Sequence, residues 1–95
     1  MAVSIIIPTL NEAQALPETL TSLDRLMPQA LDIVVADAGS ADATVEIARN
    51  AGVEVISDLP KGRAGQMNAG AAAAQGDLLC FLHADTVLPQ DFVAL

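Results

Sequence analysis

The chain has 95 residues, of which 53% are hydrophobic and 17% are charged, and its formal net charge is -8. This length suggests one domain with a limited core, and the apolar content excludes a disordered acidic tail. The negative charge argues against nucleic acids and anionic membranes as partners, because both favour basic surfaces.

The first predicted elements are a strand and a helix. Residues 2–9, AVSIIIPT, form an apolar run that predicts a strand. Apolar residues then recur at helical spacing, together with Pro17, which a helix tolerates only in its first turn. The apolar positions of this helix are Leu16, Leu20, Leu23 and Met27.

Two further strands follow, with a helix between them. Residues 31–37, LDIVVAD, predict the second strand, and residues 53–57, VEVIS, predict the third. Asp42 is placed to cap the intervening helix, and Gly52 is placed to end it.

The last predicted elements begin with a glycine-containing loop, KGRAG, at residues 61–65. The small-residue helix that follows, at 66–76, is suited to very close packing on a sheet. Residues 77–82, DLLCFL, predict a fourth strand, and their apolar run is typical of a strand buried on both faces. Pro89 would then open a further helix.

This alternation predicts an α/β fold, namely a Rossmann-like doubly wound parallel sheet with right-handed crossovers. No internal repeat or linker divides the chain, so residues 1–95 are expected to form one domain. The sequence stops early in the helix predicted after Pro89, and we therefore expect a domain truncated before its remaining part.

The only cysteine is Cys80, so no intramolecular disulfide can form, and its apolar neighbours predict a small buried core residue. The N-terminus lacks the basic region of a signal peptide, and Pro8 interrupts its apolar run too early for a membrane span. A cytoplasmic protein is the expectation.

Acidic residues stand at or after the ends of all four predicted strands. In parallel sheets of this kind, ligands bind beyond the carboxyl ends of the strands. Any one such acid is more often a solvated loop residue or a helix cap, but four along one edge predict a site. They are Glu12, Asp37, Asp58 and Asp85.

Four segments occur in the order found in one enzyme family: SIIIPTLNEA, VVADAGSADAT, KGRAGQMNAG and LLCFLHADTVLP. Over nearly its whole length the chain resembles the nucleotide-binding half of family 2 glycosyltransferases, the inverting GT-A type. The LHADT and GRAGQMNAG segments also resemble a bacterial branch associated with selenium- or arsenosugar-related genes. The resemblance implies transfer of a sugar from a nucleotide-diphosphate sugar to an acceptor hydroxyl. It places the catalytic base beyond Leu95, so no catalytic residue is assigned.

The resemblance also implies roles for residues near the nucleoside. Asp37 would accept the N3–H of uracil, a donor that cytosine lacks, which favours a UDP-linked donor. Pro8 and Thr9 would line the nucleoside, and Glu12 would approach the ribose hydroxyls. The alternatives are an Asx turn at Asp37 and an ordinary first-turn acid at Glu12.

Arg63 is predicted in a loop before a helix, where it would contact anions or stack beside the base. A solvated basic residue is an equally good account of Lys61, and Asn68 receives no role.

The segment His83-Ala84-Asp85 occupies the position of the family's Asp-X-Asp motif. Residues one apart on an extended chain face the same side, so His83 and Asp85 would both face the site. Asp85 matches the last acid and is the predicted ligand of Mn²⁺ or Mg²⁺. His83 replaces the first acid and would contact a phosphate, the ribose or a sugar hydroxyl; the alternative is a histidine satisfied at a strand end.

A second class of function is a non-catalytic nucleotide-binding module or a self-associating fragment, because an incomplete sheet would expose an edge and favour a homo-oligomer. A dinucleotide dehydrogenase is disfavoured because no G-x-G-x-x-G follows the first strand, and an NTPase because the sequence has no phosphate-binding G-x-x-x-x-G-K loop.

Overall fold

The computed structural model describes residues 2–26 and 29–86, so Met27 and the helix predicted after Pro89 lie outside the described residues. No helix in these ranges is long and apolar enough to cross a membrane. Strands and helices alternate along this part of the chain. They are β1 (Val3–Thr9), α1 (Leu16–Asp24), β2 (Asp32–Asp37), α2 (Thr44–Asn50), β3 (Glu54–Ile56), α3 (Arg63–Ala73) and β4 (Leu78–Phe81).

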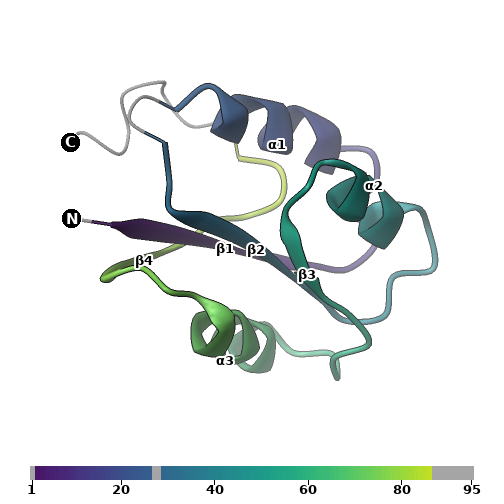
Figure 1. Ribbon diagram of the computed structural model, residues 1–95. Coiled ribbons are helices and arrows are strands. Elements are labelled where there is room, and N and C mark those ends of the chain that lie inside the picture. Colours follow the sequence, from purple (N-terminus) through teal and green to yellow (C-terminus); the bar gives the residue numbers. More distant parts are fainter. Residues whose placement is uncertain (1, 27–28, 87–95) are drawn as a thin grey trace.

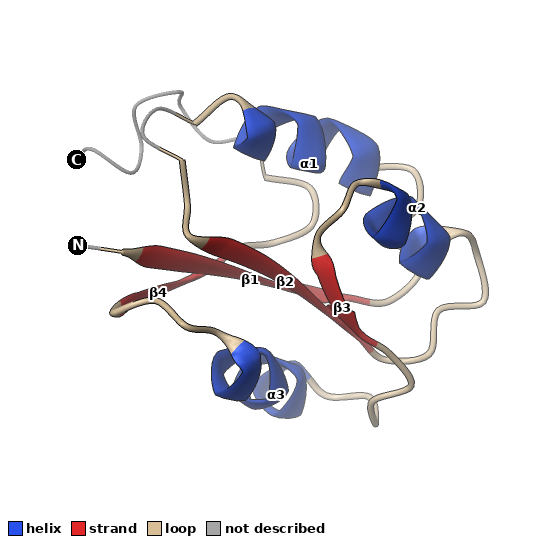
Figure 2. Cartoon of the chain, in the orientation of Figure 1, coloured by secondary structure: helices blue, strands red, loops and turns tan. Residues whose placement is uncertain are grey.

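The strands form one parallel sheet in the order β3-β2-β1-β4. Helices α1 and α2 cover one face of the sheet and α3 covers the other (Figure 1, Figure 2). The predicted fold class, a doubly wound parallel α/β sheet, is therefore confirmed. The chain winds outward from β1 to β3 and then crosses back to β4, so the strand order reverses between β1 and β4. Ligands of such sheets bind at this switch point.

The core is built around β1, whose residues alternate between the two faces of the sheet. Val3, Ile5 and Ile7 belong to the cluster that α1 completes. Ile6 points the other way, toward α3. All four are buried, as expected for a central strand with helices on both sides.

Helix α3 lies directly against β1 at Gly70. A Cβ atom added to Gly70 would meet Cγ2 of Ile6 at 2.4 Å, which leaves no room for a larger residue. The structure thus confirms the prediction that this small-residue helix packs very close to the sheet.

Replacing Gly70 with alanine is expected to lower the free energy of unfolding by about 1–2 kcal/mol. Overpacking typically costs about 1–3 kcal/mol, and the better helix propensity of alanine returns up to about 1 kcal/mol. Gly65, also in α3, is the matched control, because nothing lies within 4 Å of its added Cβ. Gly65→Ala should leave stability unchanged or raise it. Urea unfolding measures both, and equal losses would contradict the close contact at Gly70.

Helix α3 begins three residues before the predicted start and ends at Ala73. The loop before α3 ends at Gly62, the N-cap residue, whose φ of +144° glycine adopts readily and other residues rarely. Arg63 therefore lies in the first helical turn and not in the preceding loop, which corrects the prediction.

Strand β4 is an edge strand, and the prediction that it is buried on both faces is wrong. In the described sheet β4 pairs with β1 alone, and its side chains Leu78, Leu79 and Phe81 are 50%, 36% and 47% exposed. Successive side chains of a strand point to opposite faces of the sheet, so the described helices leave both faces of β4 partly open. Cys80, predicted to be buried, is only half-buried and packs against the core. Its partial burial raises the pKa of the thiol.

Candidate functional site

Two cavities that share Pro8 and Arg63 lie at the carboxyl edge of the sheet. The first, the His83 cavity, has a volume of about 80 Å³ and is lined by Pro8, Arg63, Met67, Phe81, Leu82 and His83. The second, the Glu12 cavity, has a volume of about 220 Å³ and is lined by Pro8, Thr9, Leu10, Glu12, Arg63 and Gln66. Five of the predicted site residues thus border one pair of cavities, whereas Asp37 and Asp85 line neither.

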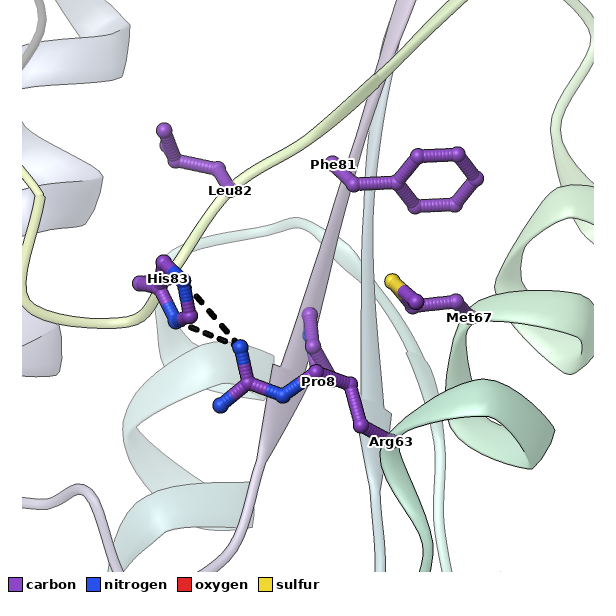
Figure 3. A pocket seen from close by; sticks show the side chains of 6 residues that line it. All are labelled: Pro8, Arg63, Met67, Phe81, Leu82 and His83. Carbon is purple, nitrogen blue, oxygen red and sulfur yellow. Dashed lines mark hydrogen bonds between the residues drawn. The ribbon is translucent and has the colours of Figure 1, made fainter.

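Arg63 connects α3 with the segment that follows β4. Its side chain extends from the first turn of α3 past Pro8 toward His83 (Figure 3). The guanidinium Nη1 lies 2.7 Å from Nδ1 and 3.1 Å from Nε2 of the imidazole. A guanidinium only donates, so a neutral imidazole accepts through its one unprotonated nitrogen. That nitrogen is then engaged, which favours the predicted ligand-contacting role of His83 over metal coordination.

The turn after β4 is fixed by two hydrogen bonds. The Thr86 N–H donates to the carbonyl of His83 at 3.1 Å, and the hydroxyl of Thr19 in α1 donates to the carbonyl of Ala84. Ala84 is buried, while His83 and Asp85 on either side of it are exposed. Residues 83–86 form a turn and not the extended chain that the prediction assumed, so a common orientation of His83 and Asp85 stays a prediction.

Asp85 presents an exposed carboxylate at this edge. Within residues 2–26 and 29–86 there is no group of three or more His, Cys, Asp or Glu side chains that could hold a metal ion. Proteins usually hold Mg²⁺ through one or two carboxylates together with substrate phosphates. Asp85 therefore fits a metal ion that arrives with a diphosphate better than a metal centre formed by the protein alone.

Asp37 is completely buried at the end of β2. Its Oδ1 accepts the hydroxyls of Thr9 and Ser40 at 2.6 and 2.5 Å, and its Oδ2 accepts the backbone N–H groups of Gly39 and Ser40 at 3.0 and 2.8 Å. A carboxylate has about four acceptor positions, and protein donors fill them. Contact between Asp37 and a base stays a prediction, and this geometry favours the alternative, an Asx turn.

The bonds to Asp37 also set its protonation. Burial by itself raises the pKa of the carboxyl, but the hydrogen bonds from Ser40, Thr9 and Gly39 together outweigh it and hold the pKa below its ordinary value. Asp37 is therefore an anion that the fold satisfies internally.

Glu12 and its two neighbours are held through their backbone by the first residue of α2 and by the loop that precedes it. The N–H groups of Asn11, Glu12 and Ala13 donate to the side chains of Ser40, Thr44 and Asp42 at 2.8, 2.8 and 3.1 Å. Asn11 has a φ of +56°, which asparagine adopts more readily than most residues. These contacts involve main-chain atoms of residues 11–13, and Glu12 lines the Glu12 cavity, as a ribose contact requires.

Gln66 is a site residue to which the sequence analysis assigned no role. It is 6% exposed, and its Nε2 donates to the carbonyls of Thr9 and Ala36, each at 2.9 Å. These carbonyls belong to the carboxyl ends of β1 and β2, so Gln66 joins both strand ends. One signal was available: Gln66 stands four residues before Gly70, on the helix face that packs on the sheet.

A third hollow, of about 370 Å³, lies at the amino ends of β2 and β3. Leu31 and Gly52 are among its lining residues, and none of the predicted site residues is. Position in the sheet, and not size, therefore selects the cavities at the carboxyl edge as the candidate site.

The chain is similar to a known family in sequence. Residues 4–94 match the family model described as Glycosyl transferase family 2. A PGL/p-HBAD biosynthesis glycosyltransferase of Mycobacterium bovis is 42% identical over 91 residues, which cover 90% of this chain and 36% of the relative. A dolichyl-phosphate hexose transferase of Haloferax volcanii is 30% identical, over 95% of this chain and 39% of the relative. The chain thus spans less than half of the length of these curated relatives.

Solved structures are similar in fold. S. aureus TarS 1-349 in complex with UDP superposes with a TM-score of 0.85 and 25% identity, over 99% of this chain and 30% of that one. Glucosyl-3-phosphoglycerate synthase from Mycobacterium tuberculosis, in complex with Mn²⁺, UDP and phosphoglyceric acid, has a TM-score of 0.79 and 27% identity. That match covers 93% of this chain and 34% of the synthase.

Proposed function

Because the chain belongs to glycosyl transferase family 2 and has the GT-A fold, we propose that it forms the donor-binding part of an enzyme that uses a UDP-linked sugar. One observation carries the proposal. Two adjoining cavities at the carboxyl edge of the sheet are lined by the residues predicted to meet the nucleotide, namely Pro8, Thr9, Glu12, Arg63 and His83. The UDP in the TarS and synthase structures supports the choice of base.

In this proposal the Glu12 cavity receives the nucleoside. Its volume of about 220 Å³ is smaller than the pockets of roughly 300–1,000 Å³ that enclose whole ligands, so it would hold the base or the ribose and leave the diphosphate outside. Arg63 lies between the two cavities, where its planar donor fork suits a phosphate. The diphosphate would then extend toward His83 and Asp85.

We propose that Asp85 contributes a carboxylate to Mn²⁺ or Mg²⁺ bound together with the diphosphate. Such a cation supplies positive charge that offsets the negative charge of a departing nucleoside diphosphate. The exposed position of Asp85 and the Mn²⁺ that accompanies UDP in the M. tuberculosis synthase support this role.

The reaction proposed for the whole protein is sugar transfer with inversion to an acceptor hydroxyl. No residue among 1–95 is assigned as the base that deprotonates this hydroxyl, and we expect the base in a part of the fold outside these residues. The much greater length of the curated relatives supports that division. A cytoplasmic location and membership of the selenium- or arsenosugar-associated branch remain predictions.

Calorimetry with UDP tests the proposal directly. We expect UDP to bind at least about tenfold more tightly with Mn²⁺ than with EDTA, and Asp85→Asn to abolish the difference. Asp58→Asn is the matched control, because Asp58 is an exposed acid that follows β3, at the opposite edge of the sheet from β4. It should preserve the metal dependence. A chain that binds no UDP contradicts the proposed function, whereas metal-independent binding contradicts only the role of Asp85.

The exposed side chains of β4 favour a second candidate function, a self-associating module without transferase activity. Leu78 and Phe81 are each about half exposed on a strand whose outer edge pairs with no described strand, and such an edge can be joined by other chains. Only the first candidate requires binding of UDP, so the same calorimetry separates the two.

A further inference from the structure

We propose that Gln66 reads the base of the donor nucleotide: its side-chain carbonyl oxygen accepts the N3–H of uracil. This inference rests on the proposed function and deepens it, because it names the residue that sets base specificity at the same site. Four features of the described residues carry it.

The first feature is the orientation of the Gln66 amide. Its Nε2 has two hydrogens, and it donates to two carbonyls, those of Thr9 and Ala36, each at 2.9 Å. A half-turn of the amide would put Oε1 against the same two carbonyl oxygens, with no hydrogen between them. The two strand ends therefore fix which end of the amide is nitrogen and which is oxygen.

The second feature is the position left for Oε1. Gln66 is more than nine-tenths buried, yet it lines the Glu12 cavity. No described residue donates a hydrogen bond to Oε1. Every fully buried side-chain oxygen or nitrogen in the described ranges has a partner, so Oε1 itself is not fully buried. With no donor among the described residues, Oε1 is open to a ligand, and the cavity that Gln66 lines is the Glu12 cavity.

The third feature is that Asp37 has no acceptor position open. The carboxylate that the sequence predicts for uracil is fully buried and accepts four hydrogen bonds from Thr9, Gly39 and Ser40. Gln66 lies at the same edge, bound to the residue before Asp37 in β2. It thus offers a fixed neutral acceptor close to the place where the sequence predicted a charged one.

The fourth feature is the chemistry of the bases. Uracil presents an N–H at N3, which pairs with a carbonyl oxygen. Cytosine presents a lone pair at N3, which would face the lone pairs of Oε1 and leave both groups without a partner. A fixed acceptor in the Glu12 cavity therefore favours uracil over cytosine. Sites built to hydrogen-bond a donor of their ligand reject analogues that lack this donor.

The experiment begins with the unaltered 95-residue chain and three ligands, UDP, CDP and N3-methyl-UDP, titrated in a calorimeter with Mn²⁺. We expect CDP and N3-methyl-UDP to bind about tenfold more weakly than UDP, or worse, because each lacks the N3–H. Equal affinities for the three overturn the inference and leave the proposed function standing. Absence of any UDP binding overturns both, so the two failures are distinguishable.

The variant Gln66→Met keeps the length of the side chain and removes its oxygen. It should bind UDP and CDP with nearly equal affinity, while Gln75→Met, the same change at an exposed glutamine, should keep the preference for UDP. A folded Gln66→Met protein that still prefers UDP overturns the inference.

Gln66→Met also leaves the carbonyls of Thr9 and Ala36 without their donor, so thermal unfolding is measured in parallel. A second variant, which keeps a donor for these carbonyls, is tested in case Gln66→Met does not fold. In Gln66→Lys the ammonium can donate to the carbonyls of Thr9 and Ala36 and still direct an N–H at the base. We expect it to reverse the preference, so that CDP binds more tightly than UDP. Unchanged preference for UDP in this variant overturns the inference, and the comparison of ligands on the unaltered chain decides the question if neither variant folds.

Discussion

Asp37→Ala is expected to lower the free energy of unfolding by about 3 kcal/mol or more, the largest loss we predict for any one substitution in the chain. The variant removes a fully buried carboxylate and with it the acceptor of four hydrogen bonds from Thr9, Gly39 and Ser40. The two hydroxyls can pair with each other, but the two backbone N–H groups lose their bonds to the carboxylate, and a hydrogen bond to a charged group contributes about 1.5–3 kcal/mol. Domains of this size have little stability to lose.

The same carboxylate is expected to make the fold sensitive to acid. The folded pKa of Asp37 lies below its unfolded value, which is about 3.9. A group with a lowered folded pKa stabilises the protein above the unfolded pKa, and this contribution is lost as the pH falls through the folded pKa. Stability should therefore fall as the pH drops below about 4, and it should fall less steeply in Asp37→Asn, which takes up no proton.

Asp42 provides the matched control for the loss of stability at neutral pH. Its carboxylate also accepts hydrogen bonds, first from the hydroxyl of Thr44 and then from backbone N–H groups, and these bonds lower its pKa. Asp42 is exposed, however, so water can replace a lost acceptor. Urea unfolding at neutral pH should show a much smaller loss for Asp42→Ala than for Asp37→Ala. Equal losses would show that burial does not give the Asp37 turn its importance.

The positions of most elements could be predicted because their patterns depend on local chemistry. The strand at residues 3–9 was expected from its apolar run, and helices on both faces bury its side chains. The equally apolar β4 shows the limit of this reasoning. Apolar side chains indicate what a strand is able to bury, whereas the actual burial depends on which elements pack over the two faces of the sheet at that strand. In the described chain β4 has β1 on one side only.

The candidate site was predictable to the extent that it follows from strand ends. Pro8, Thr9 and Glu12 border the Glu12 cavity because β1 is central and parallel to its neighbours. The hydrogen-bond partners of the side chains were less predictable. The partners of Asp37 depend on the backbone of the following turn, where Gly39 has a φ of +82°. Those of Gln66 depend on how α3 is rotated over the sheet, which the sequence indicates only through the spacing to Gly70.

Arg63→Ala is expected to weaken the binding of UDP by about 10- to 100-fold. A hydrogen bond between charged partners contributes about 1.5–3 kcal/mol, and every 1.4 kcal/mol is tenfold in affinity. Arg63 and Pro8 line both cavities. A nucleotide that extends from one cavity toward the other therefore passes the guanidinium of Arg63. Calorimetry with Mn²⁺ present measures the loss.

Two further variants separate charge from geometry. Arg63→Lys keeps the positive charge but loses the planar donor fork, so its affinity for UDP should lie between those of Arg63 and Arg63→Ala. Lys61→Ala is the matched control, because Lys61 is an exposed cation two residues away that lines neither cavity. It should change the affinity by less than about threefold, since exposed charges outside a site are well screened by salt. A loss as large as that of Arg63→Ala would mean that general positive charge, and not this position, attracts the nucleotide.

The binding of uridine, which has no diphosphate, tests which part of the nucleotide Arg63 contacts. If the guanidinium contacts the diphosphate, Arg63→Ala should weaken UDP strongly and leave the weak binding of uridine unchanged. If it stacks beside the base instead, uridine and UDP should lose affinity by the same factor. We expect the first result, because the guanidinium of Arg63 reaches His83. The exposed Asp85, the proposed ligand of the metal ion that accompanies the diphosphate, follows His83 by two residues. Equal losses would move Arg63 to the base and leave the diphosphate to His83 and the metal ion held by Asp85.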